Sequence, residues 1–417
     1  MNFVGSCYYR IHRIMLTCLG LWPYYTRCSN YVCCIFLSLF FISGIIFQLT
    51  VLINKEYSMD TYLKVYSFIG PILLYIIKYF TIFFKSNKAK NLMEQIRYDW
   101  DSLKEKEELK IMHKRANIGK RFTFIMIILT YTMIFLCMLT FYWPNILDIV
   151  IPLNESRQSW NFPNTMEYFI NQKKYIYLLT VYLILIGFIG ATILIALDTL
   201  AMMCAQHACA MFQITSYRIE CIVNRSQMKS LAISKKSDIY KSIAKAIDSH
   251  LRGIKFVDSM KSIYETVHLF IIPIGVAVLS INLYYFCEYI MADTRDSNII
   301  ITFGFIICHF CYMFLNNYIG QQIIDHSNNV FKKICSTRWY ATPLYTQKCL
   351  LLMMHRSMKS TTLSIRCVFL PSLEGFATVK GEEMREEYKS SVFFFTSHTY
   401  LFAAHQRVAI ILYGNLF

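Results

Sequence analysis

The segment YIYLLTVYLILIGFIGATILIALD, residues 175–198, decides the fold class of this chain. It runs for 24 residues, and its only charged residue is Asp198 at the end. Because an α-helix rises about 1.5 Å per residue, roughly 20 apolar residues cross the ~30 Å hydrocarbon core of a bilayer. The segment therefore predicts a helix that spans a membrane.

Further segments of this kind lie along the whole chain. Five are long enough to span a membrane, at residues 31–53, 62–84, 122–143, 266–290 and 298–318, and a seventh at 361–379 is apolar but short. Only 16% of all residues are charged and 56% are hydrophobic, whereas soluble domains carry about 25% charged residues. We predict an all-α polytopic membrane protein with seven transmembrane helices, of which the seventh is incomplete.

Lysine and arginine alternate between the two ends of these predicted helices. Segments 1–30, 85–121, 199–262 and 319–360 hold 30 of them, and loops 54–61, 144–174 and 291–297 hold 5. Basic residues concentrate on the cytoplasmic side, so we expect an N-terminus inside the cell and a multi-pass protein of the plasma membrane. The triplet Asn154-Glu155-Ser156 then lies outside and predicts glycosylation at Asn154.

The long basic segment after the fourth predicted span has the apolar spacing of helices. Apolar residues recur at intervals of three and four at Ile219, Ile222, Val223, Ile243, Ile247, Leu251 and Ile254. We therefore expect the fourth and fifth helices to extend well into the cytoplasm. Such amphipathic extensions need a partner for their apolar face.

The sequence lacks the residue patterns that are typical of enzymes and of metal or cofactor sites. The ten histidines are scattered, the Cys308/Cys311 pair has no second pair, and no phosphate-binding or nucleophile motif occurs. We expect no enzyme, no cofactor and no metal site. The net charge of +16 is divided by loop rather than gathered on one segment, which argues against a nucleic-acid partner.

Ionisable residues and prolines within the spans are candidates for function. Lys78 lies toward the inner end of the second span, where we expect it to snorkel to the cytoplasmic face, and His309 is expected to pack within the sixth. Prolines 71, 273 and 371 predict kinks that open space between helices. Aromatic residues in the outer halves form either an interfacial belt or the walls of a cavity for volatile organic molecules.

Motifs spread over the length carry a resemblance to a known family. They are LGLWPY at 19–24, HLRGIKFVDSM at 250–260, NYIGQQIIDHSNNVF at 317–331, RWYATPLYTQKCLLLMMHRSMKSTTL at 338–363 and FLPSLEGFATV at 369–379. On these residues the chain resembles insect odorant receptors, among them the receptors of ants, bees and wasps. The resemblance covers about residues 1–379. A gustatory receptor of the related family and a G-protein-coupled chemoreceptor stay as alternatives, the second opposed by the placement of the basic residues.

The resemblance implies an odorant-binding subunit of a ligand-gated cation channel in olfactory neurons. Such a subunit binds a small volatile organic ligand, lies in membrane lipid and joins a shared co-receptor in a hetero-tetramer. The ligand site would comprise Tyr66, Ile69, Leu73, Cys137, Thr140, Phe141, Tyr177, Val181, Ile184 and Phe303. The subunit anchor would use Trp339, Tyr340, Pro343, Gln347 and Lys348, and the pore Phe369, Leu373 and Phe376.

The expected organisation follows from these assignments. It comprises a cytoplasmic segment 1–30, a six-helix bundle 31–318, an anchor segment 319–360, the start of a pore helix 361–379 and a tail 380–417. The tail resembles nothing in the family, because KGEEMREEYKS at 380–390 interrupts the apolar run that the family continues. We therefore expect an incomplete pore and a chain that does not conduct ions.

Overall fold

The computed structural model describes residues 4–25, 27–54, 59–150, 172–228, 236–291, 298–364 and 371–372. Within these residues the chain is helical and contains no strand, which confirms the all-α prediction. The helices are α1 (Ser6–Cys18), α2 (Arg27–Asn54), α3 (Met59–Phe84), α4 (Ser86–Ser102), α5 (Lys106–Val150), α6 (Gln172–Met228), α7 (Lys236–Met291), α8 (Asn298–Ser336), the 3-10 helix η2 (Trp339–Ala341) and α9 (Leu344–Met358).

Six of the described helices, α2, α3, α5, α6, α7 and α8, are long and apolar enough to cross a membrane. Each contains one of the six long apolar segments of the sequence. The seventh segment differs from its prediction, because residues 361–364 and 371–372 have no helical conformation in the structure. A helix that begins at residue 361 is therefore not observed, and the rest of 361–379 lies outside the described residues.

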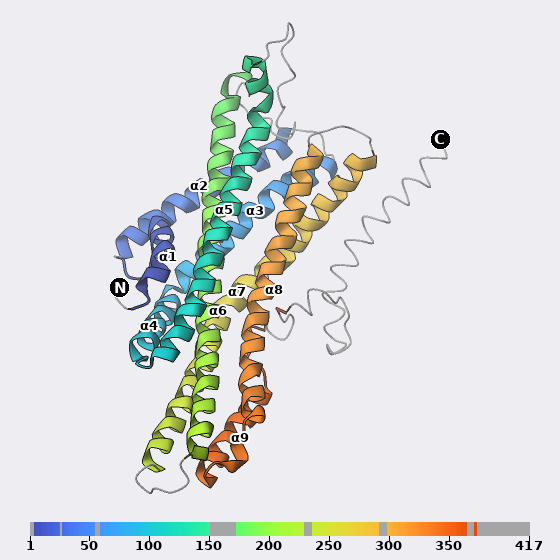
Figure 1. The fold of residues 1–417 in the computed structure, drawn as a ribbon. Coiled ribbons are helices and arrows are strands. Elements are labelled where there is room, and N and C mark those ends of the chain that lie inside the picture. Colours follow the sequence, from blue (N-terminus) through green and yellow to red (C-terminus); the bar gives the residue numbers. More distant parts are fainter. Residues whose placement is uncertain are drawn as a thin grey trace.

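Three helices continue far beyond the length that a bilayer requires. Helices α6 and α7 contain 57 and 56 residues and α8 contains 39, against the roughly 20 that span a membrane. Figure 1 shows these helices running on past α4 to the end of the molecule where α9 lies. The expected helical extensions are therefore present. Their basic residues lie in the part of the molecule that also contains α4 and α9.

The extensions pack around the middle of α6. Small residues at Ala205, Ala208 and Cys209 are fully buried there and let neighbouring helices approach, and Phe212 fills the space between them. The predicted apolar stripe is largely confirmed, since Ile219, Ile222, Val223, Ile243 and Ile254 are buried and Ile247 is partly buried. Leu251 is 45% exposed, because the buried face of α7 runs through His250, Gly253 and Ile254 and leaves Leu251 one position off it.

The short motif LGLWPY joins α1 to α2 and is structural. Gly20 has a φ of +66°, and a Cβ atom at this position would lie 2.5 Å from Cβ of Cys33. Leu19, Leu21 and Trp22 are buried beside it, and the hydroxyl of Tyr79 on α3 donates to the carbonyl of Leu19 at 3.0 Å. The motif thus fixes α1 and the start of α2 against α3.

Candidate ligand site and the polar core beneath it

The structure describes part of the predicted ligand site, at the end of the bundle where α5 meets α6 and α7 meets α8 (Figure 1). Ile69 is 5% exposed and packs in a cluster with Val65, beside the partly buried Ile45 and Leu73. Ile184 is partly buried, whereas Tyr66, Val181 and Phe303 are 46–54% exposed. The structure therefore brings Ile69 and Leu73 together on α3 against α2, while the three exposed side chains stand apart from this cluster.

Four predicted ligand residues have side chains outside the described residues, namely Cys137, Thr140, Phe141 and Tyr177. The predicted glycosylation site Asn154 and the pore residues Phe369, Leu373 and Phe376 also lie outside them. These assignments stay predictions.

A few hydrogen-bonding side chains lie among the apolar residues at this end of the bundle. The hydroxyl of Tyr182 on α6 lies 2.5 Å from Oγ of Ser43 on α2, and its ring packs edge-on against Phe40 and Phe47. Oγ of Ser67 on α3 donates to Oδ1 of Asn282 on α7 at 3.3 Å. A few hydrogen-bonding groups in an aromatic and aliphatic wall suit small organic ligands. The sequence prediction missed Tyr182, because the residues three and four positions away on its helix are leucine and isoleucine and give no polar signal.

Lys78 on α3 does not snorkel, so that prediction is wrong. Its ammonium donates to Oδ1 of Asp198 on α6, and the lysine is 2% exposed. The same ammonium lies 4.7 Å from the ring centre of Tyr312 on α8. A buried charge is retained only when it is paired, and Asp198 supplies the opposite charge. Three helices therefore meet at one ion pair inside the bundle.

A second polar contact lies beside the first and brings in α7. Nε2 of His268 on α7 lies 3.0 Å from Oδ1 of Asn316 on α8, and Nδ1 lies 2.9 Å from the carbonyl oxygen of Tyr264. The imidazole also stacks on the ring of Tyr264 with centres 3.6 Å apart. Both His268 and Asn316 are buried.

The segment after α9 returns to α8. The backbone N–H of Ser372 donates to Oδ1 of Asn317 at 3.1 Å, and that of Thr361 donates to Oγ of Ser327 at 2.9 Å. Gly320 permits this approach, because a Cβ atom there would collide with the backbone of Pro371. Pro371 is therefore part of a docked, buried segment on α8 rather than of an observed kinked helix.

The five predicted anchor residues lie together in η2 and the first turns of α9. Nε2 of Gln347 donates to the carbonyl oxygens of Tyr340 and Thr342, both at 2.7 Å. Trp339 packs against the core of the extensions, Pro343 precedes α9, and Lys348 is exposed. The large apolar side chains Tyr340, Leu344, Tyr345, Leu351 and Leu352 are 47–72% exposed beside them. The two hydrogen bonds of Gln347 thus stabilise the turn between η2 and α9, and the exposed apolar side chains lie beside this turn.

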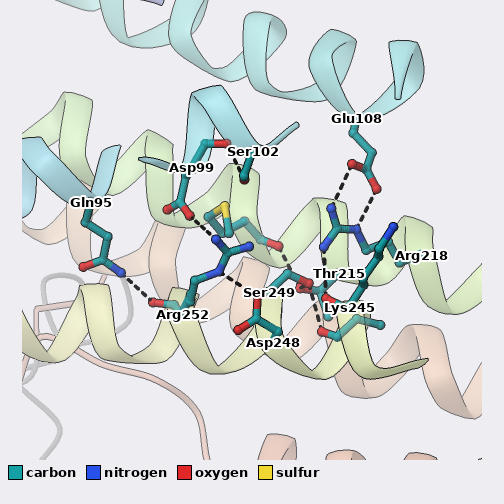
Figure 2. Close-up of polar contacts among 12 residues, drawn as sticks. Gln95, Asp99, Ser102, Glu108, Thr215, Arg218, Lys245, Asp248, Ser249 and Arg252 are labelled. Atoms are coloured by element: carbon teal, nitrogen blue, oxygen red, sulfur yellow. Dashed lines mark hydrogen bonds and ion pairs between the residues drawn. The ribbon is translucent and has the colours of Figure 1, made fainter. Parts of the chain in front are cut away.

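A set of buried charges ties α4 and α5 to the extensions of α6 and α7 (Figure 2). Asp99 on α4 is 1% exposed; its two carboxylate oxygens lie 3.0 Å from Nε2 of His207 and 3.0 Å from a guanidinium nitrogen of Arg252. Glu108 on α5 receives two hydrogen bonds from Arg218 on α6, at 2.6 and 2.8 Å. We call these residues the charged clasp. No sequence motif predicted it, because the paired residues are 108 to 153 positions apart.

Arg218 also joins α7, since it donates to the carbonyl oxygen of Lys245 at 3.0 Å, and Oγ1 of Thr215 lies 2.9 Å from Oγ of Ser249 (Figure 2). Farther along, a cavity of about 360 Å³ lies between α6 and α8. Its lining is Gln213, Ser216, His326, Asn329, Lys332, Lys333 and Ser336. This polar lining does not suit an apolar volatile ligand, which favours the other half of the bundle for that role.

A comparison with protein-family models identifies the family of this chain. The family model described as 7tm Odorant receptor matches residues 58–381.

The chain belongs to the odorant receptor family.

Solved structures support the same fold. The insect olfactory receptor OR5 from Machilis hrabei in complex with eugenol matches with a TM-score of 0.68 at 13% identity, over 94% of this chain and 97% of that one. A second structure of the insect olfactory receptor OR5 from Machilis hrabei matches with a TM-score of 0.65 at 12% identity, over 95% of this chain and 97% of that one. A search of curated proteins found no match. At these identities the likeness shows the fold alone.

Membership in the family confirms several expectations from the sequence. This odorant receptor is a multi-pass membrane receptor for small odorant ligands and is not an enzyme. The match decides against the gustatory and G-protein-coupled alternatives. It also ends at residue 381, before the acidic residues that begin at Glu382.

Proposed function

We propose that this odorant receptor is the odorant-binding subunit of a heteromeric ligand-gated cation channel in the plasma membrane of olfactory neurons. It would assemble with a shared co-receptor into a hetero-tetramer. The observation that carries the proposal is the division of the bundle into two unlike ends. One end has apolar walls with a few polar tips, and the other has a closely packed core with an exposed apolar surface on η2 and α9.

The ligand-binding role belongs to the first end. Ile69, Leu73 and Ile184 supply aliphatic walls there, and Tyr182, Ser43 and Ser67 supply hydroxyl groups. Apolar walls with sparse hydrogen-bonding groups favour a mostly apolar odorant with one or two small polar groups. Eugenol, which the neighbouring olfactory receptor holds, is a molecule of this kind and is a reasonable first probe.

The assembly role belongs to the second end. Tyr340 and Leu352 are 65% and 72% exposed in the single chain, and their neighbours on η2 and α9 are apolar as well. An exposed apolar patch beside a rigid turn is typical of a subunit interface. Lipid would instead cover the exposed apolar residues of the spans, such as Phe36 on α2 and Ile128 on α5.

The pore role belongs to residues 361–379, and the tail 380–417 would disable it. The docking of Ser372 and Thr361 on α8 supports an attachment of this segment to the bundle. The family match ends at residue 381, which supports a tail that is foreign to the family. We therefore propose that this subunit binds odorant and assembles but does not conduct.

The odorant site is tested in a repaired receptor, in which a complete final helix from a conducting odorant receptor replaces residues 380–417. Ile69→Ala removes three methyl or methylene carbons from the wall, and Tyr66→Ala removes a ring that is 54% exposed at the same end. One methylene gained or lost in a hydrophobic pocket already changes discrimination between ligands about 10- to 200-fold. We expect these variants to reorder a panel of odorants by evoked current.

A matched control is available at the other end of α2. Tyr31 has the same 54% exposure as Tyr66 and packs on Phe83. Tyr31→Ala should leave the odorant order unchanged. If Ile69→Ala and Tyr66→Ala scale all currents equally, as a defect in expression would, the ligand site lies elsewhere.

A further inference from the structure

The contact of Lys78 with Tyr312 and that of His268 with Asn316 lie on one face of α8. Tyr312 and Asn316 are four residues apart, so they lie one above the other on that helix, with Gly320 a further turn along. Nδ2 of Asn316 donates to the carbonyl oxygen of Tyr312 at 2.9 Å, which keeps the two residues in register. Asn317 adjoins this face and accepts the hydrogen bond of Ser372.

A continuous path of contacts results. Asp198 on α6 pairs with Lys78 on α3, whose ammonium rests on the ring of Tyr312. Asn316 bonds His268 on α7, and the next residue, Asn317, holds Ser372. Helices α3 and α7 thus each contact one face of α8 through a polar group, and α6 joins them through the ion pair of Asp198 with Lys78. The segment that follows α9 docks at the end of that face.

We propose that Lys78 is a positioning residue: together with Asp198, His268 and Asn316 it fixes the rotation of α8 that holds Ser372 on Asn317. We call the contacts among Lys78, Asp198, Tyr312, His268 and Asn316 the relay. Its role in carrying ligand-induced movement of α3 and α6 to the pore segment rests on the proposed channel function. The positioning of α8 does not depend on that function.

Energetics favour a positioning role over a purely stabilising one. A buried ion pair contributes little net stability compared with an apolar pair of the same size, because both charges lose their hydration. Its best-attested effect is to specify one arrangement among several, since any other arrangement leaves a buried charge without its partner. Ionisable groups within membrane spans are otherwise disfavoured, so a retained pair indicates a role in mechanism.

Hydrogen exchange of two backbone amides tests the proposal on the full chain in detergent, without any channel activity. The amide of Ser372 reports the contact that the relay should control, and the amide of Thr361 reports a neighbouring contact on Ser327 that the relay does not include. We expect Lys78→Met to speed exchange at Ser372 roughly tenfold, because loss of a positioning contact opens the local structure. Exchange at Thr361 should stay at the wild-type rate.

Three further variants separate positioning from general loosening. Lys78→Met with Asp198→Leu removes both charges and leaves neither unpaired, so it keeps the test open where the single variant fails to fold. This double variant should show the same fast exchange at Ser372. Lys78→Arg should restore protection. Lys85→Met is the matched control, because Lys85 lies directly after α3 and donates hydrogen bonds to Ser262 and Thr266 on α7 rather than to α8.

The proposal is overturned if Ser372 keeps wild-type exchange in the double variant. It is equally overturned if Thr361 accelerates with Ser372, or if Lys85→Met has the effect of Lys78→Met. None of these results bears on whether the receptor binds odorant or joins a channel, so the relay and the proposed function fail separately.

Discussion

Replacing residues 380–417 with the apolar end of the last helix of a conducting odorant receptor is expected to turn a silent subunit into a conducting one. The unaltered chain co-expressed with the co-receptor should give no odorant-evoked current above that of the co-receptor alone. The repaired chain should give a current well above that background. Patch-clamp recording from matched cells measures both.

The physical reason is the cost of the charges that follow residue 379. Lys380, Glu382, Glu383, Arg385, Glu386, Glu387 and Lys389 occupy the positions where a last span would continue. On insertion scales each costs about 2.5–3.5 kcal/mol at the centre of a membrane helix, and together they exceed what the remaining apolar residues supply. We therefore expect the outer half of the proposed pore helix not to insert in this chain.

Equal surface expression of the two chains and equal co-purification of the co-receptor are the controls. They show that the repair acts on conduction rather than on assembly. A robust odorant-evoked current from the unaltered chain would show that the tail is compatible with a working pore.

Arg218→Met is expected to lower the free energy of unfolding by about 3–5 kcal/mol, since it leaves the carboxylate of Glu108 buried without its partner. The side chains of Glu108 and Arg218 are 5% and 14% exposed, so water does not replace the lost contact. A loss of this size lowers the apparent melting temperature by roughly 10 °C. Fluorescence-detected gel filtration after heating measures it.

Two comparison variants show that the effect comes from the unpaired charge. Glu108→Leu combined with Arg218→Met removes both charges and should recover most of the loss, because apolar packing replaces the pair. Lys333→Met breaks the exposed pair with Glu220, whose side chains are 36% and 44% exposed, and should cost less than about 1 kcal/mol. If the double variant is as unstable as Arg218→Met, the loss of stability does not come from an unpaired Glu108. It then comes from the lost attraction between the two charges.

The helices of this receptor could be predicted from the sequence because their signal is local. Twenty or more apolar residues in succession have few alternatives to a membrane helix, as residues 175–198 illustrate. The buried stripe of α6 could be predicted from spacing as well. Leu251 shows the limit of this method, since a neighbouring helix decides which of two adjacent positions on α7 becomes buried.

The polar contacts could not be predicted, because they join residues that are distant in sequence. Lys78 has a local explanation, snorkelling, and nothing in its own segment points to Asp198, which lies 120 residues away. Asp99 likewise lies in one basic segment of the sequence, and His207 and Arg252 lie in another, with nothing in either segment that points to the other. Their pairing depends on how α4, α6 and α7 pack, which the sequence pattern does not specify.

Every functional assignment depends on which end of the bundle faces the outside of the cell, so a topology measurement tests the account most directly. One epitope tag is placed at the N-terminus and another beside Asn154, in the segment that joins α5 to α6. We expect antibody to reach the N-terminal tag only after permeabilisation, to reach the second tag in intact cells, and glycosidase to reduce the mass of the chain at Asn154. Strong labelling of the N-terminal tag in intact cells would contradict the account, because the proposed odorant site would then face the cytoplasm.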